Sequence, residues 1–424
     1  MPAIEKTSVQ GNVSFFKRKR GYAVLGLVLA LGVSSVWYHR AAVAGAARSA
    51  DARAEAADTG DEFTTLSGGW GELQCRLVSL EQPAEYIAFD KNDWSGPFWH
   101  IAAPTESVLK QSLLQAGCDE GTATKLLATK RSDAPGQWVL KPDDETILGL
   151  KEEVRSRLYL LLADNPLNRG QAAPLYVPKG DVERVFQGKF DPARNLETWA
   201  RHLSYKRNGY VYFSDMEVLA RVARLNEEER ATLRRAVSAT PVVMARLKVG
   251  SPAGLDSVVN YWGFSMPGVL VKDIRPLFDA QLRSPGGGAV SILYVLPPLA
   301  RAKLYTTPLT PKADEPLPDC HFTALNFFSE SVDPQLSNQD YATRYLSERY
   351  YQIGAPGRPG DLVVLVDAQN RIVHSATYLA GDVVYTKNGI NLGQPWVLMH
   401  LDDMLGCYSV KETVRVGYMR KRTS

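Results

Sequence analysis

Two residues in the last part of the chain have the side-chain types that nucleophilic catalysis needs. Cys320 follows Asp319 in the stretch PLPDCHFTALNFF, residues 316–328, at the predicted start of a helix. Asp is a preferred residue just before a helix, and Pro318 keeps the entering chain extended. The unpaired N–H groups and the helix dipole at that end stabilise a thiolate. The pattern therefore predicts a reactive cysteine.

The predicted partner base is His374, 54 positions after Cys320. Residues 354–389 have the turn residues and apolar runs of a three-stranded antiparallel meander. Its strands are expected at 361–366, 372–379 and 383–388. His374 lies on the middle strand, so we expect a rigid sheet to hold its imidazole.

The third member of the site depends on the turn between the last two predicted strands. With a three-residue turn at 380–382, His374 faces Asn388 and has Thr386 diagonal to it. An amide or a hydroxyl there can accept the Nδ1–H of the imidazole and orient it, as in a Cys-His-polar triad. A two-residue turn would place other residues opposite, so both Thr386 and Asn388 stay candidates.

Three short motifs in this order resemble the NlpC family of bacterial cell-wall cysteine peptidases. They are DC at 319–320, PGDLV at 359–363 and HSATYL at 374–379, within a resemblance that covers residues 316 to about 409. The resemblance implies a papain-like fold, with Cys320 as the nucleophile, His374 as the general base and Thr386 in the place of the third residue. It further implies cleavage of amide bonds in peptidoglycan stem peptides, without metal or cofactor.

Two departures from the family pattern concern the site itself. The family usually has Ser-Gly after DC, whereas this chain has the bulkier His321 and Phe322. Thr386 stands where the family usually has His, Asn or Gln, which makes Asn388 a candidate substitute. Substrate recognition beside the nucleophile and the orientation of the base are the properties that these departures affect.

An uncharged apolar segment near the N-terminus predicts export. Residues 21–38 would form a helix of about 27 Å, close to the roughly 30 Å of hydrocarbon in a bilayer. Four basic residues precede the segment and acidic residues follow it, so residues 1–20 are expected in the cytoplasm of a bacterium. We expect a single-pass signal anchor in the inner membrane, although the small residues at 42–46 also suit a cleaved signal peptide.

The rest of the chain predicts an α+β protein outside the cytoplasm. Of the 424 residues, 45% are hydrophobic and the formal net charge is +3, which gives no basic footprint for nucleic acid. The fold class expected is an N-terminal transmembrane helix, a large α+β exported domain and a C-terminal papain-like domain with a helix and an antiparallel sheet. The boundaries expected are a cytoplasmic tail at 1–20, the anchor at 21–38, a linker at 39–62, the α+β domain at 63–305, a Pro-rich bridge at 306–318 and the NlpC-like domain at 319–424.

Local patterns in the large middle domain predict several elements but no chemistry. The apolar spacing predicts one long helix over 142–163, and Asn226 with Glu229 predicts a capping box that opens another helix. The run at 289–296 predicts a strand. This domain, which could comprise two subdomains, has no assigned role.

The four cysteines leave alternatives open for Cys320. In an exported protein, two disulfides, or one disulfide with free thiols, are expected among Cys75, Cys118, Cys320 and Cys407. Cys320 could therefore be half of a bridge with Cys407, or a buried apolar residue, and His374 could be an ordinary sheet histidine.

Three functions follow from these alternatives. The first is an exported cysteine hydrolase that acts on peptidoglycan or another envelope peptide through a Cys320 thioester. The second is an inactive envelope protein that uses the same fold for binding or as a scaffold. The third is an acyltransferase that passes the thioester's acyl group to an amine or a lipid.

Overall fold

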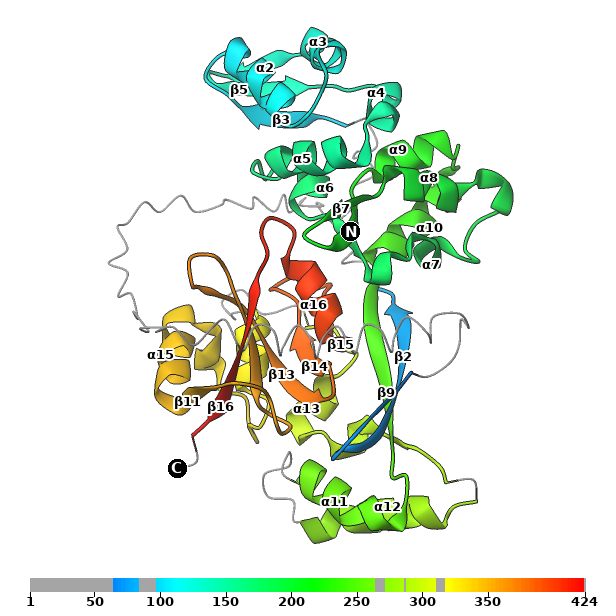
Figure 1. Cartoon of the computed structure of the whole chain (residues 1–424), viewed down its shortest axis with the longest axis vertical. Helices are drawn as coiled ribbons and strands as arrows, with labels where there is room; N and C mark the ends of the chain where they lie inside the picture. The colour runs from blue at the N-terminus through cyan, green and yellow to red at the C-terminus, as the bar shows by residue number, and fades with distance from the viewer. Residues whose placement is uncertain (1–63, 84–96, 264–270, 286, 310–316, 423–424) are drawn as a thin grey trace, which may run out of the picture. The chain divides into compact units, whose positions relative to one another are not determined.

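A six-stranded antiparallel sheet carries the candidate histidine. The structure is a computed structural model that describes residues 64–83, 97–263, 271–285, 287–309 and 317–422 (Figure 1). The strand order of this sheet is β11-β16-β12-β13-β14-β15. Its strands are β11 (Tyr350–Ile353), β12 (Leu362–Val366), β13 (Ile372–Ala380), β14 (Val383–Lys387), β15 (Trp396–His400) and β16 (Arg415–Lys421).

Short helices cover this sheet on both faces. On one face, the ring of Phe327, just after α14, lies 5.4 Å from that of Tyr385 in β14. The other face is covered by α16, whose last residue, Tyr408, packs with Val363 and Ala376. Side chains alternate along a strand, so Val363 and Ala376 point away from the first face. The helices are α14 (Cys320–Leu325), η7 (Pro334–Ser337), α15 (Gln339–Arg349) and α16 (Leu401–Tyr408).

A second sheet, of four strands, is built around one long pairing between distant parts of the chain. Strands β2 and β9 are antiparallel from Glu72 opposite Lys248 to Leu80 opposite Thr240. Its strand order is β1-β2-β9-β10, with β1 (Thr64–Gly68), β2 (Gly71–Leu80), β9 (Thr240–Lys248) and β10 (Val290–Ser291). The elements around β10 are η5 (Pro252–Gly254), α11 (Leu255–Gly263), α12 (Val271–Arg283), η6 (Ile292–Val295) and α13 (Pro298–Lys303).

Between β2 and β9 the chain forms a mostly helical region with two small sheets. One sheet has the order β3-β5-β4 and the other β6-β8-β7. The strands are β3 (Trp99–Ala102), β4 (Arg131–Ala134), β5 (Gln137–Leu140), β6 (Leu175–Val177), β7 (Tyr205–Arg207) and β8 (Tyr210–Phe213). The helices are α2 (Glu106–Gln115), α3 (Glu120–Ala128), α4 (Asp144–Gly149), α5 (Glu152–Leu162), α6 (Arg169–Ala172), η3 (Pro178–Gly180), α7 (Val182–Phe186), η4 (Pro192–Arg194), α8 (Leu196–Leu203), α9 (Met216–Val222) and α10 (Glu227–Ser238).

One hydrophobic core joins the four-stranded sheet to the six-stranded sheet. Leu73 and Val243, from the long β2–β9 pair, pack in the same buried cluster as Tyr385 and Leu398 of β14 and β15. Residues 61–424 form a single compact unit. Described residues before and after the predicted boundary at 306–318 therefore share one core.

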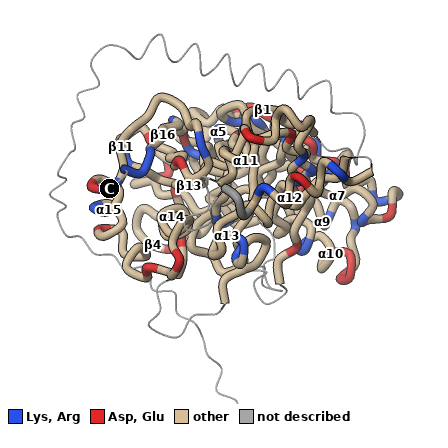
Figure 2. The backbone as a smooth tube through the Cα atoms, turned by 90° about the horizontal axis from the view of Figure 1, so that it is seen from below, with Lys and Arg blue, Asp and Glu red and all other residues tan. Residues whose placement is uncertain are grey.

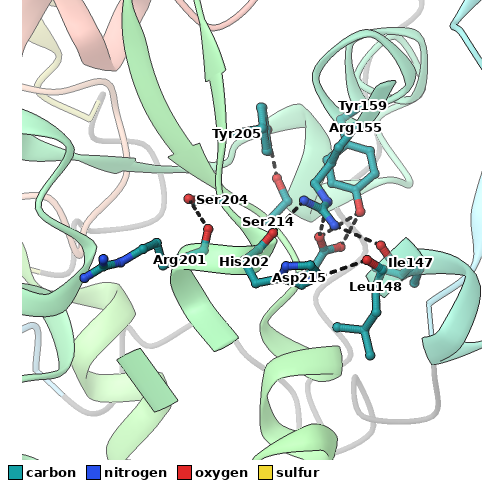
Figure 3. A network of polar contacts seen from close by, with 10 residues as sticks. All are labelled: Ile147, Leu148, Arg155, Tyr159, Arg201, His202, Ser204, Tyr205, Ser214 and Asp215. Atoms are coloured by element: carbon teal, nitrogen blue, oxygen red, sulfur yellow. Dashed lines mark hydrogen bonds and ion pairs between the residues drawn. The ribbon is translucent and has the colours of Figure 1, made fainter. Parts of the chain in front are cut away.

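A buried charged cluster, here called the Arg155 cluster, lies within the helical region (Figure 3). The Tyr159 hydroxyl lies 2.7 Å from each carboxylate oxygen of Asp215, and Arg155 Nε lies 3.8 Å from that carboxylate. The guanidinium also donates to two backbone carbonyls, those of His202 and Ile147. All three side chains are buried, and Arg155 Nε is the one nitrogen of the guanidinium without a hydrogen bond.

Local sequence rules were right about some of these elements and wrong about others. The capping box is present: Asn226 accepts from the Glu229 N–H, and the Glu229 side chain accepts from the Asn226 N–H. The predicted helix over 142–163 is instead the pair α4 and α5, because Leu150, after Gly149, is extended. The predicted strand at 289–296 pairs only at Val290–Ser291, where the Ser291 hydroxyl accepts from Leu293 N–H and begins η6.

The predicted fold class needs correction where it included a transmembrane helix. Residues 21–38 lie outside the described residues. Among the described helices, none is both long and apolar enough to span a bilayer. The longest of them, α12, has 13 residues, about 20 Å of helix against roughly 30 Å of hydrocarbon. In the part that the structure describes, the fold is a mixture of helices and antiparallel sheets with no spanning helix.

Acidic and basic residues are interspersed along the described backbone (Figure 2). This distribution agrees with the formal charge of +3 from 49 basic and 46 acidic residues. Ion pairs such as Lys125 with Glu145 and Arg221 with Asp144 connect neighbouring elements. These exposed or half-buried pairs add little stability individually.

Candidate active site

Helix α14 begins as the sequence predicts, with Cys320 as its first residue. The Asp319 carboxylate accepts from the Phe322 N–H at 2.7 Å, and Asp319 itself is extended. The Thr323 hydroxyl donates to the Asp319 carbonyl at 2.7 Å. These contacts satisfy groups at the helix start that would otherwise have no partner. The position of Cys320 is therefore fixed by its own local sequence.

The thiol of Cys320 is buried, with only 5% of the residue exposed. Burial raises the pKa of this thiol to about 11, and the nearby Asp319 carboxylate adds to the rise. Hydrogen bonds from the backbone N–H groups of Ser375 and His321 oppose the rise but do not cancel it. The expected lowering of the thiol pKa by the helix start is wrong for this state, because desolvation outweighs those donors.

His374 is completely buried in β13 and is held through one ring nitrogen. Its Nε2 lies 2.9 Å from Thr386 Oγ1. The strand register pairs Thr377 with Tyr385, as the predicted three-residue turn required. The turn itself is different, because Ala380 pairs with Val383 across the two residues Gly381 and Asp382 and a bulge shifts the register after Tyr378. The diagonal contact with Thr386 is therefore confirmed. The expected orientation through Nδ1 is wrong, because the hydroxyl contacts Nε2 instead.

The other ring nitrogen of His374 has no hydrogen-bond partner among the residues that the structure describes. Nδ1 is buried without one, and the Tyr408 ring stacks at 4.2 Å between centroids. Burial lowers the pKa of His374 to about 3, and the nearby His321 adds to the lowering. The ring is therefore neutral at pH 7. In the tautomer that donates from Nε2 to Thr386, Nδ1 has a free lone pair that can accept a proton.

Cys320, at the start of α14, lies next to β13, the strand that carries His374, but no hydrogen bond joins the two side chains. The N–H that bonds to the Cys320 sulfur belongs to Ser375, the residue directly after His374. No hydrogen bond joins the thiol to Nδ1, which has no partner. The side chains of His374 and Ser375 alternate across β13. The sulfur therefore lies beside the backbone of the histidine strand, on the side where α14 packs.

Asn388, the alternative third residue, makes no hydrogen bond with His374. Its Nδ2 lies 3.1 Å from Met399 Sδ, and its Oδ1 is buried without a hydrogen-bond partner. Thr386 is therefore the residue that orients the ring in this structure.

The two residues after Cys320 that depart from the family pattern have definite places. His321 Nδ1 lies 2.9 Å from Ser375 Oγ, and burial lowers the pKa of this histidine. Phe322 lines an apolar cavity of about 150 Å³ together with Pro318 and Trp396. Both bulky side chains are thus accommodated in the fold.

Three neighbours of the site were not identified in the sequence: Ser375, Lys387 and Tyr408. Alternation along β14 places Lys387 on the same face as Val383 and Tyr385, so a lysine on an apolar face was a detectable feature. Tyr408 could not be found in this way, because its contact with His374 depends on the docking of α16.

The helix that carries Tyr408 is fastened to the β6–β8 sheet. The Tyr176 hydroxyl donates to Asp403 at 2.9 Å, and the Tyr212 hydroxyl donates to the Gly406 carbonyl at 2.7 Å. A side chain at position 406 would lie 2.3 Å from the Tyr176 ring, so only glycine allows this approach. Residues of the helical region thus determine where α16, and with it Tyr408, lies.

No disulfide forms among the four cysteines. Cys75, Cys118, Cys320 and Cys407 all have free thiols. The expected bridges, including one between Cys320 and Cys407, are therefore absent from the structure. Burial raises the pKa of Cys118 to about 11 and that of Cys407 to about 12.

Comparisons of the chain with family models, with curated proteins and with solved structures found no match, so the resemblance to the NlpC family remains a prediction from the motifs.

Proposed function

We propose that this protein is a cysteine hydrolase that cleaves amide bonds in peptides, with Cys320 as nucleophile, His374 as general base and Thr386 as the residue that orients the base. One observation carries the proposal: His374 is held through Nε2 while Nδ1, its proton-accepting nitrogen, is buried without a partner. An unpaired buried nitrogen costs about 1 to 3 kcal/mol, so its persistence needs an explanation.

The chemistry follows from this arrangement. The Cys320 sulfur attacks the amide carbonyl while its proton passes to His374 Nδ1, and the imidazolium then protonates the departing amine. This step requires the thiol, on the α14 side of β13, and the ring, which stacks on Tyr408 of α16, to move within hydrogen-bond distance of each other. Water, deprotonated by the same nitrogen, cleaves the resulting thioester and releases the acid and the free thiol. Thr386 accepts from Nε2–H throughout and favours the charged ring.

The resting state described here is a neutral one. Burial raises the pKa of the thiol to about 11 and lowers that of His374 to about 3, so both groups hold their uncharged forms. Proton transfer would therefore accompany attack on bound substrate. Substrate must also gain access, because His374 is fully buried and the Tyr408 ring covers it.

The substrate class proposed is an envelope peptide, with peptidoglycan stem peptides first. This choice rests on the motif resemblance and on the expected export of the chain, both of which remain predictions. No feature of the described residues selects one stem-peptide bond over another.

A second function, a non-catalytic binding or scaffold module of the envelope, is favoured by one observation. Both members of the proposed couple are almost fully buried, Cys320 at 5% and His374 at 0% exposure. Buried cysteines with raised pKa values are generally unreactive. A module of this kind would bind envelope peptides without cleaving them.

Digestion of purified muropeptides by the full chain separates the two functions. The wild type should release new amino groups, and Cys320→Ala should reduce the rate by at least about 1000-fold, because no other thiol can take its role. Cys75→Ala, which removes a buried thiol elsewhere, is the matched control and should keep the wild-type rate. Equal binding of muropeptides by the wild type and Cys320→Ala, with no cleavage by either, would establish the scaffold function instead.

A further inference from the structure

Lys387, at the end of β14, is a buried cation that the proposed chemistry has not used. The residue is 0% exposed, and its ammonium group donates to the carbonyls of Gly389 at 2.7 Å and Asn391 at 3.0 Å. Burying an ammonium group is costly unless charges or several dipoles compensate for the lost water. Two neutral carbonyls provide only part of that compensation.

The strand pairings place Lys387 beneath the start of α14. Lys387 pairs with Trp396 of β15, and directly paired residues share a face of the sheet. The Trp396 indole N–H donates to the Thr323 hydroxyl of α14 at 3.0 Å, so this is the face that α14 covers. The Lys387 side chain therefore starts from the sheet surface under the helix that begins with Cys320.

The pairing of β14 with β13 also places Lys387 near Cys320. Thr377 of β13 pairs with Tyr385 of β14, and Ser375 and Lys387 each lie two residues beyond this pair on their own strands. The Ser375 N–H bonds to the Cys320 sulfur, and its hydroxyl lies 2.9 Å from His321 Nδ1. Lys387 thus lies on the strand beside the residue that contacts the nucleophile.

The titratable groups that act on Lys387 are at the start of α14. They are Asp319, the residue that caps the helix, and Cys320, its first residue. Burial lowers the pKa of Lys387 to about 8, while Asp319 and Cys320 favour its charged form. At pH 7 the side chain is therefore an ammonium ion close to an aspartate and a thiol.

Lys387 is also linked to Tyr408, the residue whose ring covers His374. Its ammonium group holds the Gly389 carbonyl, and the Gly389 N–H donates to the Tyr408 hydroxyl. The Tyr408 ring stacks on His374. Lys387 is therefore close to the nucleophile Cys320, and it is linked through Gly389 to Tyr408, the residue that covers the base His374.

We propose that Lys387 is a further positioning residue of the candidate site, whose positive charge stabilises the thiolate of Cys320 as it forms. This role rests on the proposed function, because a thiolate matters only where Cys320 reacts. A nearby cation commonly favours an ionised acid by one to three pKa units. The lysine would thereby offset part of the burial and of the Asp319 charge that oppose ionisation.

Alkylation of Cys320 by iodoacetamide across pH 6–10 tests the role, with the modified peptide quantified by mass spectrometry in the full chain. Lys387→Met keeps an apolar stem and removes the charge. We expect it to slow alkylation of Cys320 about 10-fold at pH 7, because one pKa unit changes the thiolate fraction tenfold. Lys411→Met, which removes a charge from an exposed position, is the matched control and should leave the rate unchanged.

Asp319→Asn should change the rate in the opposite direction. Asn is as good a residue before a helix as Asp, so α14 is retained while the negative charge beside the thiol is lost. Faster alkylation in this variant and slower alkylation in Lys387→Met would together support the role. Unchanged alkylation in a folded Lys387→Met protein would overturn it.

Two further outcomes keep this test separate from that of the proposed function. If Lys387→Met does not fold, Lys387→Gln replaces it, and an unchanged alkylation profile in Lys387→Gln overturns the role. If the lysine variants change alkylation but muropeptides are never cleaved, Lys387 controls the thiol and the hydrolase proposal fails. If muropeptides are cleaved at the wild-type rate and pH dependence in Lys387→Gln, the hydrolase stands and the role of Lys387 fails.

Discussion

The Arg155 cluster and the candidate active site are both buried and polar, but they differ in how fully their groups are paired. In the Arg155 cluster, Asp215 accepts from Tyr159, and the guanidinium bonds to two carbonyls (Figure 3). Its one nitrogen without a hydrogen bond, Nε, still lies 3.8 Å from the carboxylate. In the candidate site, His374 Nδ1 and Asn388 Oδ1 are buried with no hydrogen bond.

This difference separates groups that serve the fold from groups available for chemistry. In the Arg155 cluster every polar group except Nε has a hydrogen bond, Nε is close to an opposite charge, and removing one member leaves a buried charge. An unsaturated site has already lost the hydration of its polar groups without regaining a partner. The comparison predicts that mutations in the two regions will affect different properties, stability in the first and reactivity in the second.

Acid should destabilise the protein through His374. Because the pKa of this residue is lowered to about 3, the unfolded chain binds a proton between pH 6.5 and 3 that the native state does not. The free energy of unfolding should therefore fall over this range, by up to about 5 kcal/mol from this group. Urea unfolding at pH 7 down to pH 4 measures the slope.

His374→Gln should remove most of that slope, leaving the contribution of His321, whose pKa is also lowered. His202→Gln changes an exposed histidine outside the site and should retain the wild-type slope. If His374→Gln lost stability in acid as steeply as the wild type, His374 could not be the buried neutral base described here.

Asp215→Ala should destabilise the protein by about 3 to 5 kcal/mol, since it leaves the Arg155 guanidinium buried without its anion. Tyr159→Phe removes one hydroxyl from the same cluster and should cost less, about 1 to 3 kcal/mol. Urea unfolding at pH 7 gives both values. A stable Asp215→Ala protein with altered Cys320 alkylation would reverse the comparison between the two regions.

Thr386→Val should have the smallest effect on stability, about 1 kcal/mol, because it removes one neutral hydrogen bond to His374. It should still slow muropeptide hydrolysis at least about 10-fold, because the imidazole is then free to turn. Thr377→Val is the control: its hydroxyl is buried without a hydrogen bond, so its loss should be neutral or stabilising. Equal rates in the two variants would remove Thr386 from the site.

Local rules predicted the parts of the site that depend on neighbours in sequence. Asp319 caps α14, and the pairing of Thr377 with Tyr385 agrees with the predicted register, although the predicted three-residue turn is a two-residue turn with a bulge. Each of these needs only a few adjacent residues. The capping box at Asn226 was predicted in the same way and for the same reason.

Properties that depend on distant packing could not be predicted. The thiol pKa of Cys320 is governed by its burial where α14 packs on β13 and β14, which no local pattern reports. The Tyr408 ring lies on His374 only because α16 docks on the six-stranded sheet. The break between α4 and α5 also overrode a favourable apolar spacing, with Gly149 and an extended Leu150 ending the first helix.

The hydrogen bonds from Tyr176 and Tyr212 to α16 limit which parts of this chain can be separated by recombination. A segment that began at α14 would keep Cys320, His374 and Thr386 but lose the two hydroxyls that hold the helix bearing Tyr408. The motifs at 319–320, 359–363 and 374–379 therefore do not form a domain that could be transferred to another protein on its own. Gly406 and Tyr176, 230 positions apart, must be inherited together, because the ring of one occupies the space that a side chain at the other would fill.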